Sequence, residues 1–203
     1  MEIFKREFDS SFEYSYIEVG KFLYKYLFNM IESNRPIIFL CIGTDRCTGD
    51  SLGPLVGYKL KNISLLFESK NIYFYGSLEN PIHSLNLESV LLKINSNFIN
   101  PYIIAIDSCL GQTINIGKVF ISNAPVYPGA ALNKNLPSVG DLSITGIVNI
   151  SSKYDFLTLQ NTRLYTVMLL SDTIYKGIHY FLELYEKHFI KTNKKEELLR
   201  DEQ

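Results

Sequence analysis

The stretch Ile37-Ile38-Phe39-Leu40-Cys41-Ile42 is an unbroken apolar run that ends at Gly43. A short run that is apolar on both faces is typical of a central parallel strand that helices cover on both sides. Residues 44–53 form a polar, glycine-containing loop after it, and a helical apolar stripe begins near Pro54. Proline suits the first turn of a helix, because its missing N–H has no partner there. The stretch therefore predicts a strand, a loop and a helix at the centre of the fold.

The same alternation recurs along the chain and predicts an α/β fold. Its expected form is a three-layer α/β/α sandwich with a mostly parallel central sheet. The strand at 117–122 is expected to run antiparallel. Residues 123–139 are rich in Pro and Gly and predict a long functional loop that shapes a substrate groove. The remaining expected elements are helices at 11–33, 54–67, 87–98 and 157–187 and strands at 37–42, 71–76 and 101–107.

The composition indicates a single domain over residues 1–203. Of these 203 residues 46% are hydrophobic, and 20 Lys+Arg balance 21 Asp+Glu. This content is too apolar for a disordered chain, and the balanced charge argues against nucleic-acid binding through a basic face. The apolar runs are far shorter than the roughly 20 residues that span a bilayer. Because the N-terminus lacks the apolar block of a signal peptide and the three cysteines are expected to be free thiols, we expect a cytoplasmic protein. The charged tail at 191–203 is expected to fray.

Two aspartates follow buried strands that are neighbours in the predicted sheet. Asp50 lies in the loop after the first strand, and Asp107 closes the strand at 101–107. Because ligands bind beyond the carboxyl ends of parallel strands, where the loops diverge, we expect both side chains in one crevice. Two carboxyl groups that interact strongly do not ionise together easily, so one keeps its proton near neutral pH. Such a pair can activate water and protonate a leaving amine, which is the chemistry of amide hydrolysis.

Other interpretations of these segments remain open. Asp50 and Asp107 are equally well explained as caps of the helix and the turn that follow them. A phosphate-binding loop after the first strand is disfavoured, because its glycines match no nucleotide fingerprint and its acids repel an anion. Cysteine catalysis is also disfavoured, because His83 is the one base at a strand end that is available to Cys47 or Cys109.

Four segments resemble the YyaC family of sporulation proteins. They are residues 41–54 (CIGTDRCTGDSLGP), 105–111 (AIDSCLG), 139–149 (VGDLSITGIVN) and 159–164 (LQNTRL). That family is similar to the germination protease of bacterial spores and, more distantly, to the hydrogenase maturation peptidases. The resemblance implies the same α/β/α fold, of the phosphorylase/hydrolase-like kind, and an aspartic-type endopeptidase in which Asp50 and Asp107 are the catalytic residues.

The resemblance also implies a cellular location, a substrate class and the kinds of partner to expect. It implies a sporulation- or germination-associated protease in the cytoplasm of the forespore or the mother cell, which acts on protein or peptide substrates. The protein is expected to bind no metal, cofactor, nucleic acid or membrane. A homo-oligomer is compatible with the resemblance. In the maturation peptidases a His joins two acids at nickel. Ser143 is the best match to that His, which disfavours a nickel site.

The alternatives are a nickel-recognising peptidase and a non-catalytic binding or regulatory protein on the same fold. The residues expected to support the two acids from nearby loops are Asp45, Arg46, Glu79, His83, Asp141 and Ser143.

Overall fold

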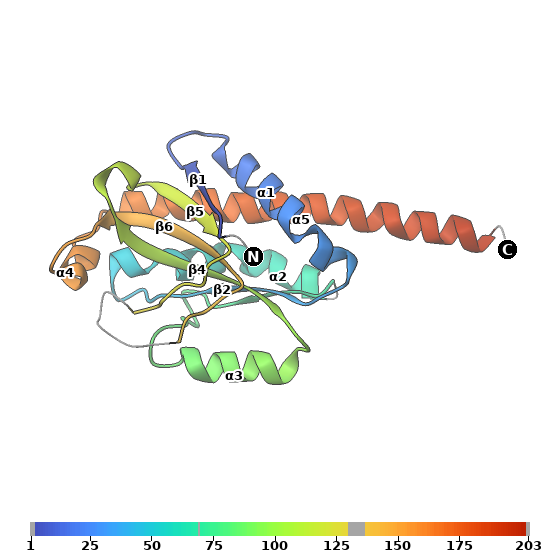
Figure 1. The fold of residues 1–203 in the computed structure, drawn as a ribbon, viewed down its shortest axis with the longest axis horizontal. Helices are drawn as coiled ribbons and strands as arrows, with labels where there is room; N and C mark the ends of the chain where they lie inside the picture. Colours follow the sequence, from blue (N-terminus) through green and yellow to red (C-terminus); the bar gives the residue numbers. More distant parts are fainter. Residues whose placement is uncertain (1–2, 69, 130–136, 202–203) are drawn as a thin grey trace.

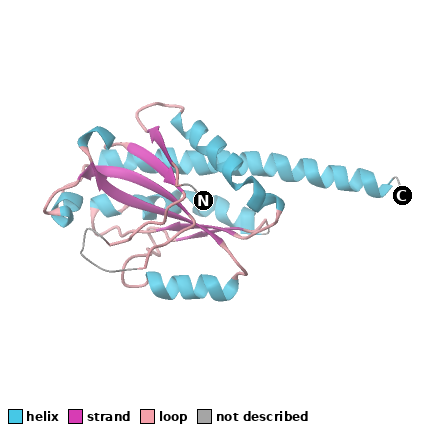
Figure 2. Ribbon diagram, viewed as in Figure 1, coloured by secondary structure: helices cyan, strands magenta, loops and turns pink. Residues whose placement is uncertain are grey.

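The computed structural model describes residues 3–68, 70–129 and 137–201 of the chain. They form a six-stranded sheet with helices packed against it, and the C-terminal part of helix α5 projects away from the sheet (Figures 1 and 2). The strands are β1 (Lys5–Asp9), β2 (Ile37–Cys41), β3 (Ile72–Tyr75), β4 (Tyr102–Gly111), β5 (Lys118–Ser122) and β6 (Leu142–Ile150). The helices are α1 (Ser15–Glu32), α2 (Leu52–Glu68), α3 (Leu87–Asn97), α4 (Asp155–Gln160) and α5 (Leu164–Asp201), with short 3₁₀ helices η1 (Thr48–Asp50) and η2 (Thr113–Asn115).

The sheet confirms the predicted α/β fold and its mostly parallel character. Its strand order is β1-β5-β6-β4-β2-β3. Strands β6, β4, β2 and β3 pair in parallel, whereas β5 runs antiparallel to both β6 and β1. The last residue pair between β2 and β4 joins Cys41 to Ile106. The segments that follow these two residues therefore leave the sheet at the same edge, where parallel sheets bind ligands.

Helices cover both faces of the sheet (Figure 1). On one face α1, α2 and α5 share a buried cluster with alternate strand residues such as Phe39, Ile106 and Ile144. On the other face α3 packs against a second cluster that includes Leu40 and Ala105. Successive strand residues point to opposite faces, so the apolar run of β2 is buried on both sides, as predicted. Among the helices of the described residues, none has the length and apolar content needed to cross a membrane.

Strands β1 and β6 lie where the sequence pattern predicted none. β6 is a central strand, but its sequence lacks the continuous apolar run that predicts one, because Thr145, Gly146 and Asn149 interrupt the apolar residues. β1 is short and largely charged, and its pairing with β5 at the sheet edge is what makes it a strand. The strand predicted at 101–107 is longer in the structure, because β4 continues to Gly111 across an irregularity in its pairing with β6.

The helix predicted at 157–187 is in fact two helices. α4 ends at Gln160 and α5 starts at Leu164, because the polar residues 161–163 turn the chain between them. α5 then continues to Asp201, through most of the tail that was expected to fray. Within the predicted loop at 123–139, Val126 and Val139 form a β-bridge, and residues 130–136 lie outside the described residues.

Helix α1 crosses α5 at a pair of glycines. A Cβ added at Gly20 would lie 2.7 Å from the carbonyl oxygen of Gly177, and a Cβ at Gly177 would clash with the side chain of Val19. Interiors packed this closely do not absorb an extra methyl group without strain. The crossing explains why α5 contains a glycine although glycine costs a helix about 1 kcal/mol relative to alanine.

We expect Gly177→Ala to destabilise the fold by about 1–3 kcal/mol, because overpacking at the crossing outweighs the gain in helix propensity. Urea unfolding of the wild type and the variant measures the difference. Lys187→Ala, an exposed change on the same helix, is the control and should stay within about 0.5 kcal/mol of the wild type. A Gly177→Ala protein as stable as the wild type would show that α1 and α5 do not meet at these glycines.

Candidate active site

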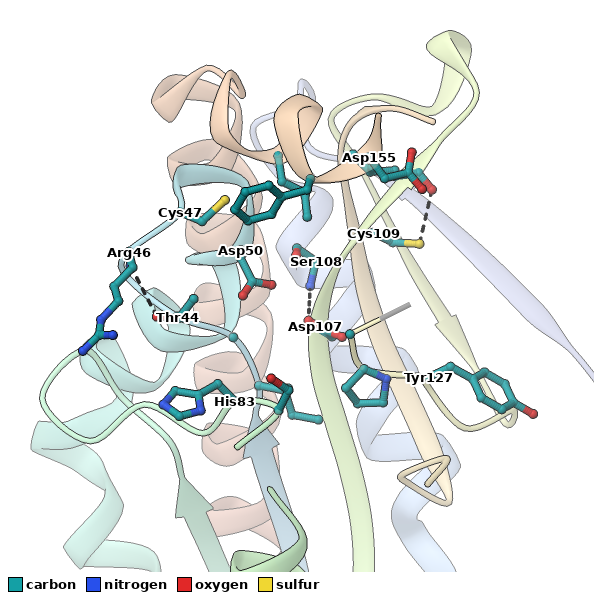
Figure 3. Close-up of a pocket in the computed structure, with 18 of the residues that line it drawn as sticks. Thr44, Arg46, Cys47, Asp50, His83, Asp107, Ser108, Cys109, Tyr127 and Asp155 are labelled. Atoms are coloured by element: carbon teal, nitrogen blue, oxygen red, sulfur yellow. Dashed lines mark hydrogen bonds between the residues drawn. The ribbon is translucent and has the colours of Figure 1, made fainter. Parts of the chain in front are cut away.

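The loop between β2 and α2 holds Asp50 at the edge of the sheet. It folds back on itself, since the Thr44 N–H donates to the main-chain carbonyl oxygen of Asp50 at 2.9 Å. Gly53, at the start of α2, approaches the carbonyl group of Ile42 so closely that a Cβ there would clash with it. η1 and the first turn of α2 pack against the end of β2. The Asp50 side chain therefore faces the ends of the central strands (Figure 3).

Asp107 comes from the neighbouring strand β4. It follows Ile106, whose carbonyl oxygen accepts the Ile42 N–H at 2.8 Å, so it stands just beyond the last pair between β2 and β4. The residue is 9% exposed, and its Oδ1 accepts the Ser108 N–H at 2.8 Å. β4 continues as a strand through this position, so Asp107 does not cap a turn.

Both carboxyl groups line one cavity of about 410 Å³ (Figure 3). Part of its wall is apolar and comes from Leu85, Phe156 and Leu159. Leu85 is 83% exposed and Phe156 is 44% exposed, so both offer apolar surface at the cavity. A cavity with an apolar wall and a few converging polar groups is typical of a ligand-binding site.

Burial raises the pKa values of the two acids unequally. The pKa of Asp50 rises to about 6 because burial removes the carboxyl group from water, and hydrogen bonds from the Thr44 N–H and the Ser108 hydroxyl oppose the rise. The pKa of Asp107 rises well above its ordinary value, first because of burial and second because of the negative charge of Asp50. Both effects disfavour an ionised carboxyl group. Asp107 therefore holds a proton more firmly than Asp50, and the pair favours a single negative charge on Asp50.

The cysteines beside the acids are poor nucleophiles. Burial raises the pKa of Cys47, and burial together with the charge of Asp107 raises the pKa of Cys109. His83 Nδ1 accepts the Leu85 N–H at 3.3 Å, so the ring turns one nitrogen toward its own loop. Since the thiolate is the reactive form of cysteine, this arrangement favours carboxylate over thiolate chemistry. Within the described ranges, no group of three or more His, Cys, Asp or Glu side chains is arranged to hold a metal ion.

The structure brings two of the predicted supporting residues to the cavity. Arg46 and His83 line it together with the two acids. Asp45 is exposed beside Arg46 on the same loop but is not one of the lining residues. Glu79 forms an exposed ion pair with Lys61, with 2.7 Å between Oε1 and Nζ, and does not line the cavity.

Asp141 and Ser143 form hydrogen bonds within the sheet. Asp141 Oδ2 accepts the Ile103 N–H at 2.8 Å, near the amino ends of β4 and β6. Ser143 is buried, and its hydroxyl donates to the carbonyl oxygen of Ser122 at 3.2 Å. Both side chains are thus engaged in the sheet, away from the residues that line the cavity.

Several cavity residues were not singled out from the sequence. Ser108 is adjacent to Asp107 in the chain, donates its N–H to the Asp107 carboxyl group and lines the cavity with both acids. Phe156 belongs to α4, which the sequence pattern merged into a longer helix. Tyr127 lies in the loop after β5, whose length did indicate a functional segment. Apolar periodicity identifies a helix but does not show which cavity it borders, because that depends on the packing of distant segments.

Comparison with known proteins identifies related sequences. Residues 11–177 match the family described as "Protein of unknown function (DUF1256)", and this range contains both acids. "Uncharacterized protein YyaC" of Bacillus subtilis (strain 168) is 44% identical over 146 residues, which cover 72% of this chain and 69% of that relative. The relative confirms the resemblance to the YyaC family that residues 41–54, 105–111, 139–149 and 159–164 predicted from the sequence.

Asp50→Asn should stabilise the protein at neutral pH by about 1–3 kcal/mol, because one unit of pKa shift corresponds to about 1.4 kcal/mol. The pKa of Asp50 is about 6 in the folded protein against 3.8 ordinarily, so the folded state binds more protons between these values. Wild-type stability therefore falls as the pH rises from about 4 to 6, and the uncharged variant lacks this part of the fall.

Urea unfolding at neutral pH and at about pH 4 measures this effect, and the gain should shrink toward zero at the lower pH. The exposed change Glu88→Gln on α3 is the control and should give no comparable gain. A variant that is less stable than the wild type at neutral pH would show that the Asp50 carboxylate is well solvated or paired.

Proposed function

We propose a peptidase function for this chain, which belongs to the family described as "Protein of unknown function (DUF1256)". In this proposal the protein cleaves internal peptide bonds of protein substrates with Asp50 and Asp107 and without a metal. The supporting observation is a buried and a half-buried carboxyl group, from distant segments of the chain, that line one cavity with unequal pKa values. Pairs of acids whose environments separate their pKa values are suited to divided acid and base roles.

The two acids have complementary roles in this reaction. Ionised Asp50 takes a proton from a water molecule as the water oxygen attacks the carbonyl carbon, and Asp107 donates its proton to the carbonyl oxygen. In the collapse of the tetrahedral intermediate, Asp50 gives its proton to the amine nitrogen and the C–N bond breaks. Asp107 then recovers a proton from the hydroxyl group. The products are a carboxylic acid and an amine, and both acids return to their starting states.

The apolar wall of the cavity suits a polypeptide substrate. Leu85, Tyr127 and Phe156 expose apolar surface that a substrate side chain can bury, and large apolar side chains gain about 1.5–3 kcal/mol from burial. A bound side chain also keeps bulk water away from the acids, which strengthens every electrostatic interaction between them and the scissile bond. Positive charge comes from Arg46, which is exposed at the same cavity.

The motif resemblance to the germination protease supports the same proposal. The segments that resemble its catalytic segments are 48–54 and 106–108, which carry the two acids. On this basis we extend the proposal to a three-layer α/β/α sandwich of the phosphorylase/hydrolase-like kind and to a cytoplasmic role in sporulation or germination. Helices on both faces of a mostly parallel sheet are compatible with that architecture. Because one fold can carry many activities, the test addresses the acids directly.

Asp50→Asn and Asp107→Asn should each slow cleavage about 100- to 10,000-fold, since each removes a proton-transfer group without changing the side-chain shape. The assay incubates purified protein with an extract of spore proteins and identifies new N-termini by mass spectrometry. Glu88→Gln, an exposed change on α3 outside the cavity lining, is the matched control and should cleave like the wild type. Full cleavage by either aspartate variant would remove the pair from the mechanism, and no cleavage by the wild type would favour a binding or regulatory protein.

The cleavage rate should depend on pH along a bell-shaped curve. It should rise through about pH 6 as Asp50 ionises and fall at higher pH as Asp107 loses its proton. One peptide cleaved in the first assay serves as the substrate, and an excess of chelator should leave the curve unchanged. Loss of activity with the chelator and recovery with nickel or zinc would point to a metal-dependent peptidase instead.

A further inference from the structure

Strand β4 is longer than its neighbour β2, and part of its edge therefore has no strand beside it (Figure 3). The last residue pair between the two strands joins Cys41 to Ile106, whereas β4 continues to Gly111 and stays paired with β6 to that point. Among the described residues, no strand pairs with Ser108–Leu110 on the β2 side of β4. We call this segment the free edge of β4. An unpaired strand edge is a template for a further strand.

The chain after β2 turns away from the free edge. The Ile42 N–H still donates to the carbonyl oxygen of Ile106 at 2.8 Å. The next N–H, that of Gly43, donates instead to the carbonyl oxygen of Ile82 at 2.7 Å, in the loop that follows β3. Gly43 has a φ of 137°, which glycine adopts readily and which allows this change of direction. The position beside the free edge is therefore part of the cavity, which Ser108 and Leu110 line.

The main-chain groups of the free edge point toward this position. Along a strand, the N–H and C=O groups of successive residues point alternately to the two neighbouring strands. The carbonyl oxygen of Ile106 accepts the Ile42 N–H and so points to β2. The carbonyl oxygen of Gly111 accepts a hydrogen bond from the chain that follows β6 and so points to the other side. The same alternation directs the main-chain groups of Ser108 and Leu110 into the cavity.

Local contacts occupy some of these groups. The Ser108 N–H donates to Asp107 Oδ1 at 2.8 Å. The Cys109 thiol donates to the carbonyl oxygen of Leu110 at 3.3 Å, and a thiol is a weak donor. The Ser108 carbonyl group and the Leu110 N–H are therefore the acceptor and the donor that an incoming strand can pair with.

The cavity presents an apolar wall to each face of such a strand. Phe156 and Leu159 of α4 line it on one side, and Leu159 belongs to the buried cluster under α1, α2 and α5. Leu85 lines it on the other side, in the loop between Ile82 and α3, and Ile82 belongs to the cluster under α3. Because side chains alternate between the faces of a strand, an extended peptide at the free edge buries successive side chains against α4 and against Leu85.

We infer that the free edge of β4 receives an extended segment of a polypeptide substrate as an added strand. The inference rests on the peptidase function proposed above and specifies how its substrate binds. Main-chain hydrogen bonds to Ser108 and Leu110 hold the segment whatever its sequence, and the two apolar walls select its side chains. Because Asp50 and Asp107 line the same cavity, the added strand brings its peptide bonds to the two acids.

The test is residue-resolved amide hydrogen exchange by NMR in the full chain, with and without a probe peptide. The probe is a short capped peptide in which leucine and threonine alternate between terminal lysines. Exchange at the Leu110 N–H should slow about tenfold when the free probe is at about ten times its Kd, because only the unbound protein exchanges there. The N–H groups of Cys109 and Gly111, which face β6, should exchange slowly with or without the probe. The same peptide with N-methyl groups on all its amides should give no protection.

A protein variant tests the same hydrogen bond from the other side. Leu110→Pro removes the N–H and should weaken probe binding by at least about tenfold, and proline is tolerated in a strand where its N–H would face no partner strand. Leu110→Val keeps the N–H and is the matched control, which should bind like the wild type. If Leu110→Pro does not fold, hydrogen exchange in the wild type decides alone. If the wild type cleaves the probe, Asp50→Asn keeps it intact for the measurement.

Failure of the probe to bind, or binding that leaves exchange at Leu110 unchanged, would overturn the inference. Equal binding by folded Leu110→Pro would do the same. Protection of Leu110 that grows with protein concentration in the absence of the probe would also overturn it, because a second copy of the chain would then occupy the edge. The measurement needs no cleavage. Protection of Leu110 by the probe in a protein that cleaves no substrate would therefore support strand addition and contradict the peptidase function.

Discussion

The structure is organised around one electrostatic constraint: two carboxyl groups, one buried and one half-buried, line the same cavity where the pairing of β2 with β4 ends. A buried carboxylate is unfavourable, and a second negative charge beside it is more so, which favours a single charge on the pair. Packing alone would select apolar side chains at this position. Because ionisable groups with strongly shifted pKa values gather at functional sites, chemistry accounts for Asp50 and Asp107 better than stability does.

The surrounding fold fixes the two acids in different ways. Asp107 is part of β4, where it pairs with Thr145 of β6 and directly follows the last pair with β2, so its main chain is held by the sheet. Asp50 is on η1, which packs between α2 and α4. The close approach of Gly53 to the end of β2 links these two supports. A site built on paired strands and packed helices keeps its geometry better than one built on a free loop.

Local patterns predicted the parts of the fold that depend on local interactions. The apolar run at 37–42 and the helix that begins near Pro54 formed as predicted, and so did the meeting of Asp50 and Asp107 at one sheet edge. β6 was missed because its pairing with β4 and β5, rather than its own composition, makes it a strand. Ser143 lies in a segment that resembles a family motif, yet its hydroxyl donates to the carbonyl oxygen of Ser122 within the sheet. Phe156 reaches the cavity because of the way α4 packs, and the apolar periodicity of the sequence does not predict that packing.

The central claim is that the pair holds one proton at neutral pH and that Asp107 carries it. Infrared difference spectroscopy detects this proton directly, because a protonated carboxyl group has a carbonyl stretch that a carboxylate lacks. The account predicts such a band in the wild type at neutral pH, its loss in Asp107→Asn and its persistence in Asp50→Asn. A wild-type spectrum without the band, or a band that Asp107→Asn leaves unchanged, would contradict the account.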